Sequence, residues 1–211
     1  MKKTFSAIVC LFMLLMFPGV SLSAAPGPYI SGQLGMAYLT DSQFSDASAG
    51  EGTVKFDLGF AVGVAGGYNF GWFREEGEIG YQINYIDSFN ACSGGTCVSG
   101  VSSSGERTAL SFMANSYVDF YNDSKFSFYI TAGVGVANVV FDHYADSGLK
   151  IGNSDSTDFA YQAGIGIGYA INKNITIDLK YRYFATLDSD FEGTEVEFKS
   201  HNVYLGLRYN F

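Results

Sequence analysis

The chain has 211 residues, of which 12 are Lys or Arg and 21 are Asp or Glu, so its formal net charge is −9. An acidic chain of this length is expected to form one domain, and its charge argues against nucleic acid and anionic surfaces as partners. Beyond the first 25 residues there is no apolar stretch of about 18 residues, which argues against a membrane-spanning helix.

The first 24 residues have the layout of a secretory signal peptide. A basic stretch at residues 1–3 precedes an apolar core at residues 5–17, and small residues at 23–25 supply a cleavage site. A membrane anchor is the alternative, but the apolar core is too short to span a bilayer. We therefore expect residues 1–24 to be removed on export. Residues 25–211 would form one mature domain, with ten basic and 21 acidic residues.

Apolar residues alternate with small or polar ones at residues 30–38, and then without a break at residues 54–70. Successive side chains of a β-strand point to opposite faces, so each segment would present one apolar face. A typical strand of a soluble protein has about 5–6 residues, whereas a tilted strand that crosses a bilayer needs about 9–11. The run at 54–70 therefore predicts a membrane-spanning strand.

Six further segments alternate in the same way, at residues 79–85, 110–120, 128–136, 159–169, 175–183 and 203–211. Short turns at 71–72, 122–125 and 172–174 alternate with four long polar stretches. This is the layout of an outer-membrane barrel, which closes on itself so that no strand edge meets lipid. A soluble ligand-binding barrel is the alternative, but its outer face would be polar, and aromatic residues here crowd the short turns. We predict an all-β fold: an eight-stranded antiparallel up-and-down transmembrane β-barrel.

Two parts of the chain resemble a known family. Residues 113–120 (MANSYVDF), a short turn and residues 129–137 (YITAGVGVA) resemble the central hairpin of the opacity-protein and related surface-antigen barrels. The last strand resembles the signal read by the outer-membrane assembly machinery, with one phase formed by Leu205, Leu207, Tyr209 and Phe211. The resemblance implies an exported protein in the outer membrane of a Gram-negative-type bacterium, which contacts extracellular ligands through its outer loops.

Charged residues occupy the phase that is expected to face the barrel lumen. They are Lys55, Asp57, Arg74, Glu76, Glu78, Asp119, Asp178, Lys180, Arg182 and Arg208, five of each sign. The interior of an eight-stranded barrel is just wide enough for side chains to fill. A selective pore usually displays charges of one sign, so a balanced set favours a network of ion pairs that plugs the lumen. The alternative is that these groups line water.

Cys92 and Cys97 lie in a Ser- and Gly-rich stretch of one long loop. In an exported protein, such a pair predicts a disulfide. Zinc binding is the alternative, but two thiolates without a nearby His supply half a site. Another long loop is acidic and holds Asp188, Asp190 and Glu192. These residues could bind a divalent cation, although such a run is more often solvated. We expect neither a metal nor another cofactor.

The two histidines give little support for catalysis. Some eight-stranded outer-membrane barrels are lipid-modifying enzymes that use Ser, His and an acid. Here His201 and the adjacent Ser200 point to opposite faces of one strand, and no motif accompanies His143. We therefore expect a non-enzymatic barrel with a structural or adhesin-like surface-interaction role through four acidic outer loops. The alternative is a narrow channel for small or apolar solutes.

Overall fold

The structure is a computed structural model that describes residues 26–40, 42–46, 50–93, 96–101, 104–121, 124–144, 150–187, 189–191, 194–196 and 198–211. Side chains are described within residues 26–40, 57–85, 105–120, 124–140, 155–187 and 198–211. The predicted signal peptide at residues 1–24 lies outside the described residues.

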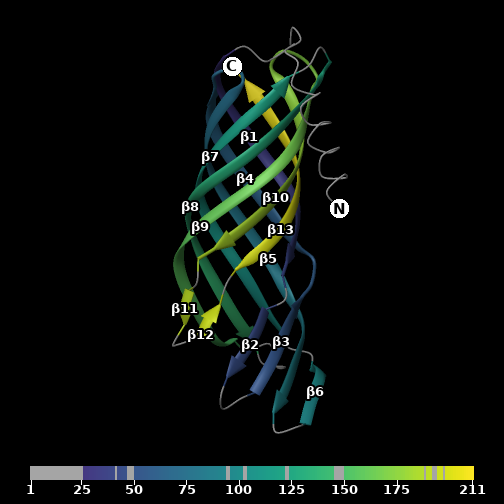
Figure 1. Cartoon of the computed structure of the whole chain (residues 1–211), viewed down its shortest axis with the longest axis vertical. Helices are drawn as coiled ribbons and strands as arrows, with labels where there is room; N and C mark the ends of the chain where they lie inside the picture. Colours follow the sequence, from purple (N-terminus) through teal and green to yellow (C-terminus); the bar gives the residue numbers. More distant parts are fainter. Residues whose placement is uncertain are drawn as a thin grey trace, which may run out of the picture.

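Among the described residues, eight antiparallel strands close into a barrel (Figure 1). They are β1 (Gly27–Leu39), β4 (Gly59–Asn69), β5 (Phe73–Ser93), β7 (Ser104–Tyr121), β8 (Phe126–Tyr144), β9 (Lys150–Ala170), β10 (Ile175–Thr186) and β13 (Lys199–Asn210). Each strand pairs with the next one along the chain, and β1 pairs with β13 to close the circle. The predicted up-and-down barrel is confirmed.

The two ends of the barrel differ in their connections. One end, the short-turn end, has the connections at residues 70–72, 122–125 and 171–174. The other, the long-loop end, has the longer connections and the short strands within them (Figure 1). These strands are β2 (Ser42–Asp46), β3 (Gly50–Phe56), β6 (Thr96–Val101), β11 (Ser189–Phe191) and β12 (Thr194–Val196). The start of β1 and the end of β13 lie side by side at the short-turn end, where the Phe211 N–H donates to the Pro28 carbonyl at 3.1 Å.

Local residue chemistry shapes the short turns. Gly71 has a φ of 108°, a left-handed conformation that favours glycine, and its N–H donates to the Asn69 side chain at 2.8 Å. In the turn before β10, the Asn172 side-chain oxygen accepts hydrogen bonds from the N–H groups of Asn174 and Ile175. Asn side chains commonly bond to nearby backbone in this way, and they fix where these two hairpins reverse.

The continuous run at residues 54–70 does not form one strand, in contrast to our prediction. β3 ends at Phe56, β4 begins at Gly59, and the register of β3 on β5 shifts between Lys55 and Phe56. Asp57 and Leu58 keep the sequence alternation across this break, so the pattern does not reveal it. β4 alone has 11 residues, which is enough to cross a bilayer at a tilt.

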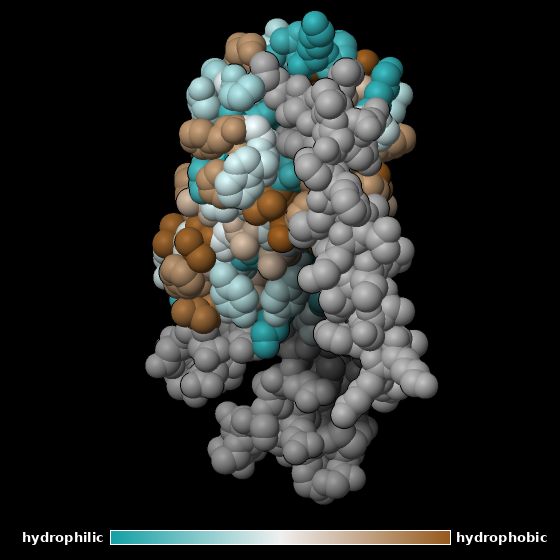
Figure 2. All heavy atoms as spheres, turned by 45° about the horizontal axis from the view of Figure 1, so that its top comes forward, coloured by the Kyte–Doolittle hydropathy of each residue, from teal (hydrophilic) through white to brown (hydrophobic). Residues whose placement is uncertain are grey.

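The outer wall of the barrel is apolar. Hydrophobic residues lie on the wall and hydrophilic residues gather at the short-turn end (Figure 2). Large side chains of the outward phase are exposed, including Leu34, Phe60, Ile79, Ile165 and Leu205. Aromatic residues ring the short-turn end, as in the girdle of an outer-membrane barrel: Tyr68, Phe70, Trp72, Phe126, Tyr169, Tyr209 and Phe211. Within the described residues, no helix is long and apolar enough to cross a membrane.

Candidate functional site

The lumen contains two layers of side chains with different chemistry. The layer nearer the short-turn end, called here the ionic layer, consists of Arg74, Glu76, Glu78, Asp119, Asp178, Lys180, Arg182 and Arg208. The layer next to the long-loop end, called here the apolar layer, consists of Leu39, Ala109, Met113, Ala137, Val139, Ala160, Phe184 and Phe198. The inward phase of the strands supplies both layers.

Two arginine–carboxylate pairs in the ionic layer are bidentate and buried. Arg74 donates to Asp119 through Nε at 2.6 Å and Nη2 at 2.9 Å. Arg182 donates to Glu78 through Nη1 at 2.6 Å and Nη2 at 2.8 Å. In both pairs the side chains are at most 3% exposed. A third pair, Arg208 with Asp178, is longer, with Nε and Oδ2 3.5 Å apart. Two parallel bonds fix the planar groups in one orientation.

Glu76 is held by neutral donors. Its two carboxylate oxygens accept bonds of 2.8–3.4 Å from Tyr29, Ser31, Asn115 and Tyr117. Tyr117 in turn accepts a bond from Lys180 Nζ at 3.3 Å, so its hydroxyl links the Lys180 ammonium to the Glu76 carboxylate. Asn115 also donates to Glu78 at 3.1 Å, which joins the two glutamates in one network. Buried charge is tolerated when its remaining polar sites are satisfied in this way.

Inward-facing tyrosines surround the arginine of the first pair. The Arg74 guanidinium lies 4.3 Å from the ring centre of Tyr117, 5.1 Å from that of Tyr129 and 5.8 Å from that of Tyr29. These distances are within the range of cation–π attraction. The rings of Tyr117 and Tyr129 themselves meet edge-on at 5.6 Å. The tyrosines therefore both pack the lumen and stabilise the positive charge in it.

Small residues make room for these large side chains on neighbouring strands. Gly166 of β9 pairs with Tyr129 of β8, and a Cβ added at Gly166 would lie 2.3 Å from the Tyr129 ring. That separation is far below van der Waals contact, so the tyrosine ring occupies the space above the glycine. Strands with small inward side chains must therefore lie beside strands with large ones for the lumen to be packed.

The apolar layer fills the described part of the lumen near the long loops. Phe184 of β10 and Phe198 meet edge-on, with ring centres 5.8 Å apart, and both are almost fully buried. The Arg107 guanidinium lies 5.1 Å from the Phe198 ring centre. A hydrophobic constriction of this kind excludes water and ions. Two small lumen cavities, lined by ionic-layer and neighbouring polar residues, measure about 20 Å³ each. Each has room for about one water molecule.

The predicted lumen residues do not all reach the ionic layer. Asp57 is exposed, between the ends of β3 and β4, and the side chain of Lys55 lies outside the described residues. The side chains of Cys92 and Cys97 also lie outside the described residues, although the backbone register places the two residues opposite each other on β5 and β6. The side chains of Asp188, Asp190, Glu192 and His143 are likewise not described. Within the described residues, no group of three metal-ligating side chains occurs.

The sequence analysis missed two sets of lumen residues. Arg107 faces inward in β7 and is buried, but it falls just after a stretch that we assigned to a loop. The inward tyrosines, Tyr29, Tyr117, Tyr129 and Tyr204, are all buried. Each occupies the phase opposite to the lipid-facing residues of its strand, and that phase was the signal that distinguishes them from girdle aromatics.

Comparisons with known proteins agree with this architecture. A family model, described as outer membrane protein beta-barrel domain, matches residues 7–211. The chain is 29% identical over 201 residues to outer membrane protein PagN of Salmonella typhimurium, covering 87% of this chain and 83% of PagN. It is 27% identical over 179 residues to putative adhesin RC1281 of Rickettsia conorii, covering 74% and 70%. The crystal structure of Neisserial surface protein A has a TM-score of 0.56 at 18% identity, covering 88% and 97%. That structural likeness shows the fold alone.

Proposed function

Because the chain belongs to the outer membrane protein beta-barrel domain family, and is therefore an outer-membrane protein of a Gram-negative-type bacterium, we propose that it is a non-catalytic, adhesin-like surface protein. In this proposal the barrel is a closed anchor, and the long loops bind a partner outside the cell. The long loops of outer-membrane barrels face the exterior and the short turns face the periplasm.

The closed lumen is the observation that carries this proposal. Bidentate ion pairs fill one layer, aromatic and aliphatic side chains fill the next, and the described lumen cavities are each of about one water molecule's size. If the lumen offers no route for solutes, the long loops are the part of the protein that can act on the surroundings. The printed name of one relative, a putative adhesin, supports the same function.

The distribution of charge suggests the chemistry of the partner. The connections at residues 40–58, 86–105, 141–158 and 187–199 contain 14 Asp or Glu and three Lys. The rest of residues 25–211 contains seven acidic and seven basic residues. All of the excess negative charge therefore lies at the long-loop end. Complementary potentials favour association, so the fitting partner is a basic protein surface and not a sulfated or phosphorylated one.

An adhesion assay tests this function. The protein is displayed on a non-adherent Gram-negative laboratory strain, and the bacteria bound to cultured epithelial cells are counted. A variant with Asp188, Asp190, Glu192, Glu195 and Glu197 changed to Asn or Gln should lose most of the gained adhesion, because it lacks the negative charge of one loop. Asp123→Asn, in a short turn, is the control and should adhere like the wild type. Equal adhesion of the neutralised variant, at equal surface level, would contradict the proposal.

We also propose that Cys92 and Cys97 form a disulfide. Their directly opposed backbone positions on β5 and β6 support this pairing. The ring that it closes is short, so the bond should contribute on the order of 2 kcal/mol in the chain-entropy model, and reduction should leave the barrel folded. Mass spectrometry of protein taken from the outer membrane should find no free thiol at either position. Two free thiols would overturn the pairing.

The last strand supports a role in assembly. Leu205, Leu207 and Tyr209 face outward and are exposed, and Phe211 follows the end of β13. We propose that this face is read by the outer-membrane assembly machinery. Deletion of Phe211 should lower the amount of protein in the outer-membrane fraction. The deletion removes no residue of the ionic layer. Normal outer-membrane levels would argue against this role.

A further inference from the structure

An aromatic and basic patch lies on the outer wall of the barrel near the long-loop end. His201 of β13 pairs with Tyr38 of β1 on one side and with Tyr183 of β10 on the other. The ring centres of Tyr183 and His201 are 5.3 Å apart, and the Tyr181 hydroxyl lies 2.7 Å from His201 Nδ1. Lys199 precedes His201 by two residues and therefore belongs to the same outward face. We call Tyr38, Tyr181, Tyr183, Lys199 and His201 the outer-wall patch.

The hydrogen bond of His201 prepares its ring for an anion. When the Tyr181 hydroxyl donates to Nδ1, the ring proton lies on Nε2, which then donates outward. Lys199 adds a positive charge on the same face, at an end of the molecule where most charged side chains are acidic. The register partners of His201 are Tyr38 and Tyr183, both uncharged. A phosphate oxygen matches this donor set.

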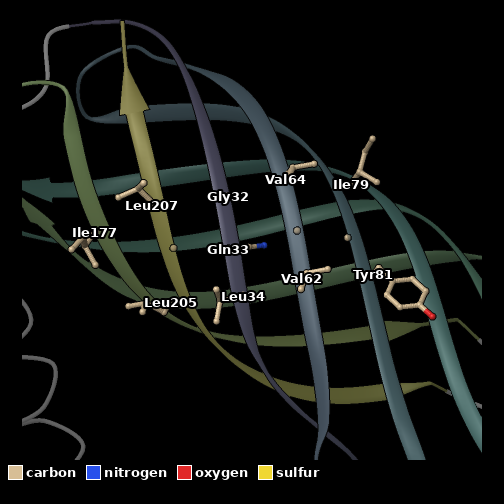
Figure 3. Close-up of a pocket in the computed structure, with 13 residues that line it drawn as sticks. Gly32, Gln33, Leu34, Val62, Val64, Ile79, Tyr81, Ile177, Leu205 and Leu207 are labelled. Carbon is tan, nitrogen blue, oxygen red and sulfur yellow. The ribbon is translucent and has the colours of Figure 1, made fainter.

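An apolar groove lies on the same wall, closer to the short-turn end than the patch. It has a volume of about 690 Å³ and is lined by outward side chains of β1, β4, β5 and β13, among them Leu34, Val62, Leu205 and Leu207 (Figure 3). Gly32 lies in its floor, between its register partners Leu207 and Val64 (Figure 3). A Cβ added at Gly32 would meet no atom within 4 Å, so the missing side chain leaves open space on the wall.

The patch and the groove have the relative position of a lipid headgroup and its chain. Leu205 and Leu207 follow His201 by four and six residues on one strand, which at about 3.3 Å per residue places them roughly 13–20 Å along it. Tyrosines and histidines are stable at the bilayer interface, where one part of the ring is apolar and the other is wet. We propose that this wall binds a phosphate-bearing lipid of the surrounding leaflet, with its phosphate at His201 and Lys199 and an acyl chain over Gly32.

Native mass spectrometry of the full barrel in detergent tests the headgroup site. The probes are phosphatidic acid and a diacylglycerol with the same acyl chains, which differ only in the phosphate. The wild type should bind phosphatidic acid at least about tenfold more tightly. His201→Gln and the double variant His201→Gln/Lys199→Gln should progressively lose this preference. Lys173→Gln, which removes an exposed lysine at the short-turn end, should keep it. Equal binding of the two lipids by the wild type, or an unchanged preference in the double variant, would overturn the site.

A second pair of variants tests the groove and separates a lipid from a free anion. Gly32→Val should weaken binding of both lipids several-fold while the preference for phosphate remains. Ala132→Val, on the outward face of β8 and away from the groove, should change neither. If Gly32→Val has no effect and inorganic phosphate displaces phosphatidic acid, the patch binds free anions and the lipid proposal is wrong. Heat-modifiable migration on gels verifies that each variant is folded.

Discussion

The two layers fill the lumen by different physical means. In the ionic layer, each side chain depends on a particular partner, as Arg182 depends on Glu78. In the apolar layer, the stabilisation from Phe184 and Phe198 depends on their volume and burial. Their apolar contacts depend little on orientation. The ionic layer should therefore be sensitive to the identity of a residue, whereas the apolar layer should be sensitive to its size.

The two layers are also complementary along the barrel axis. The ionic layer pairs most of its charged groups with one another, although Arg182 Nε has no hydrogen-bond partner among the described residues. The apolar layer lies between these groups and the long-loop end. Removing a charge in one layer and removing volume in the other are therefore distinct ways to break the same closure.

The largest effect is expected for Glu78→Ala, because it leaves Arg182 buried without its carboxylate. Breaking a buried pair from one side typically costs about 3–5 kcal/mol in the free energy of unfolding. Urea unfolding in lipid vesicles, followed by the fluorescence of the single tryptophan, Trp72, measures it. The double variant Glu78→Leu/Arg182→Met should recover most of the loss. A loss below about 1 kcal/mol for Glu78→Ala would show that water reaches the pair.

Phe198→Ala tests the apolar layer and should lower the free energy of unfolding by about 3 kcal/mol. This is the low end of the range for truncation of a buried Phe. Phe198→Leu keeps most of the volume and should cost less than about 1.5 kcal/mol. The same unfolding assay applies. Equal losses for Ala and Leu would mean that this layer, too, requires a specific side chain.

Gly166→Ala tests the packing of small against large faces and should cost about 1–3 kcal/mol. The added methyl would meet the Tyr129 ring, which would have to leave its place beside Arg74. Gly32→Ala is the matched control on the outer wall, where nothing lies within 4 Å, and should change stability little. Similar losses for both variants would point to backbone effects in place of lumen packing.

The smallest effect is expected for Asp155→Asn, which removes one exposed charge of β9 near the long-loop end. Exposed charges contribute little because water screens them, so the change should stay within about 0.5 kcal/mol in the same assay. A loss comparable to that of Glu78→Ala would mean that the charges outside the lumen stabilise the barrel as strongly as those within it.

The fold was largely predictable from the sequence, because lipid imposes a strict alternation and a closed sheet on every strand. The break between Phe56 and Gly59 was not predictable, since Asp57 and Leu58 continue the alternation while the shift in register comes from pairing with β5. Strand ends such as those of β5 and β8 extend beyond the predicted segments for the same reason: pairing, not sequence pattern, decides where they stop.

The residues of the ionic layer were predictable from the sequence, whereas the side chain that each of them contacts was less predictable. Inward charges on β5 and β10 follow directly from the phase of those strands. The choice of Asp119 for Arg74, and of Tyr117 as the link between Lys180 and Glu76, depends on which side chains meet across the lumen. A sequence taken alone contains no measure of those distances. The inward tyrosines were predictable from their phase in each strand, but their contacts with Arg74 depend on the same distances across the lumen.

Single-channel recording on the purified, refolded barrel in planar bilayers tests the closed lumen most directly. The wild type should show no steady conductance, because both the ionic layer and the apolar layer block the path, and Glu78→Ala should be less stable and open a leak. Steady conductance of the wild type, together with a Glu78→Ala variant that changes ion selectivity but not stability, would contradict a closed lumen and make the protein a narrow channel.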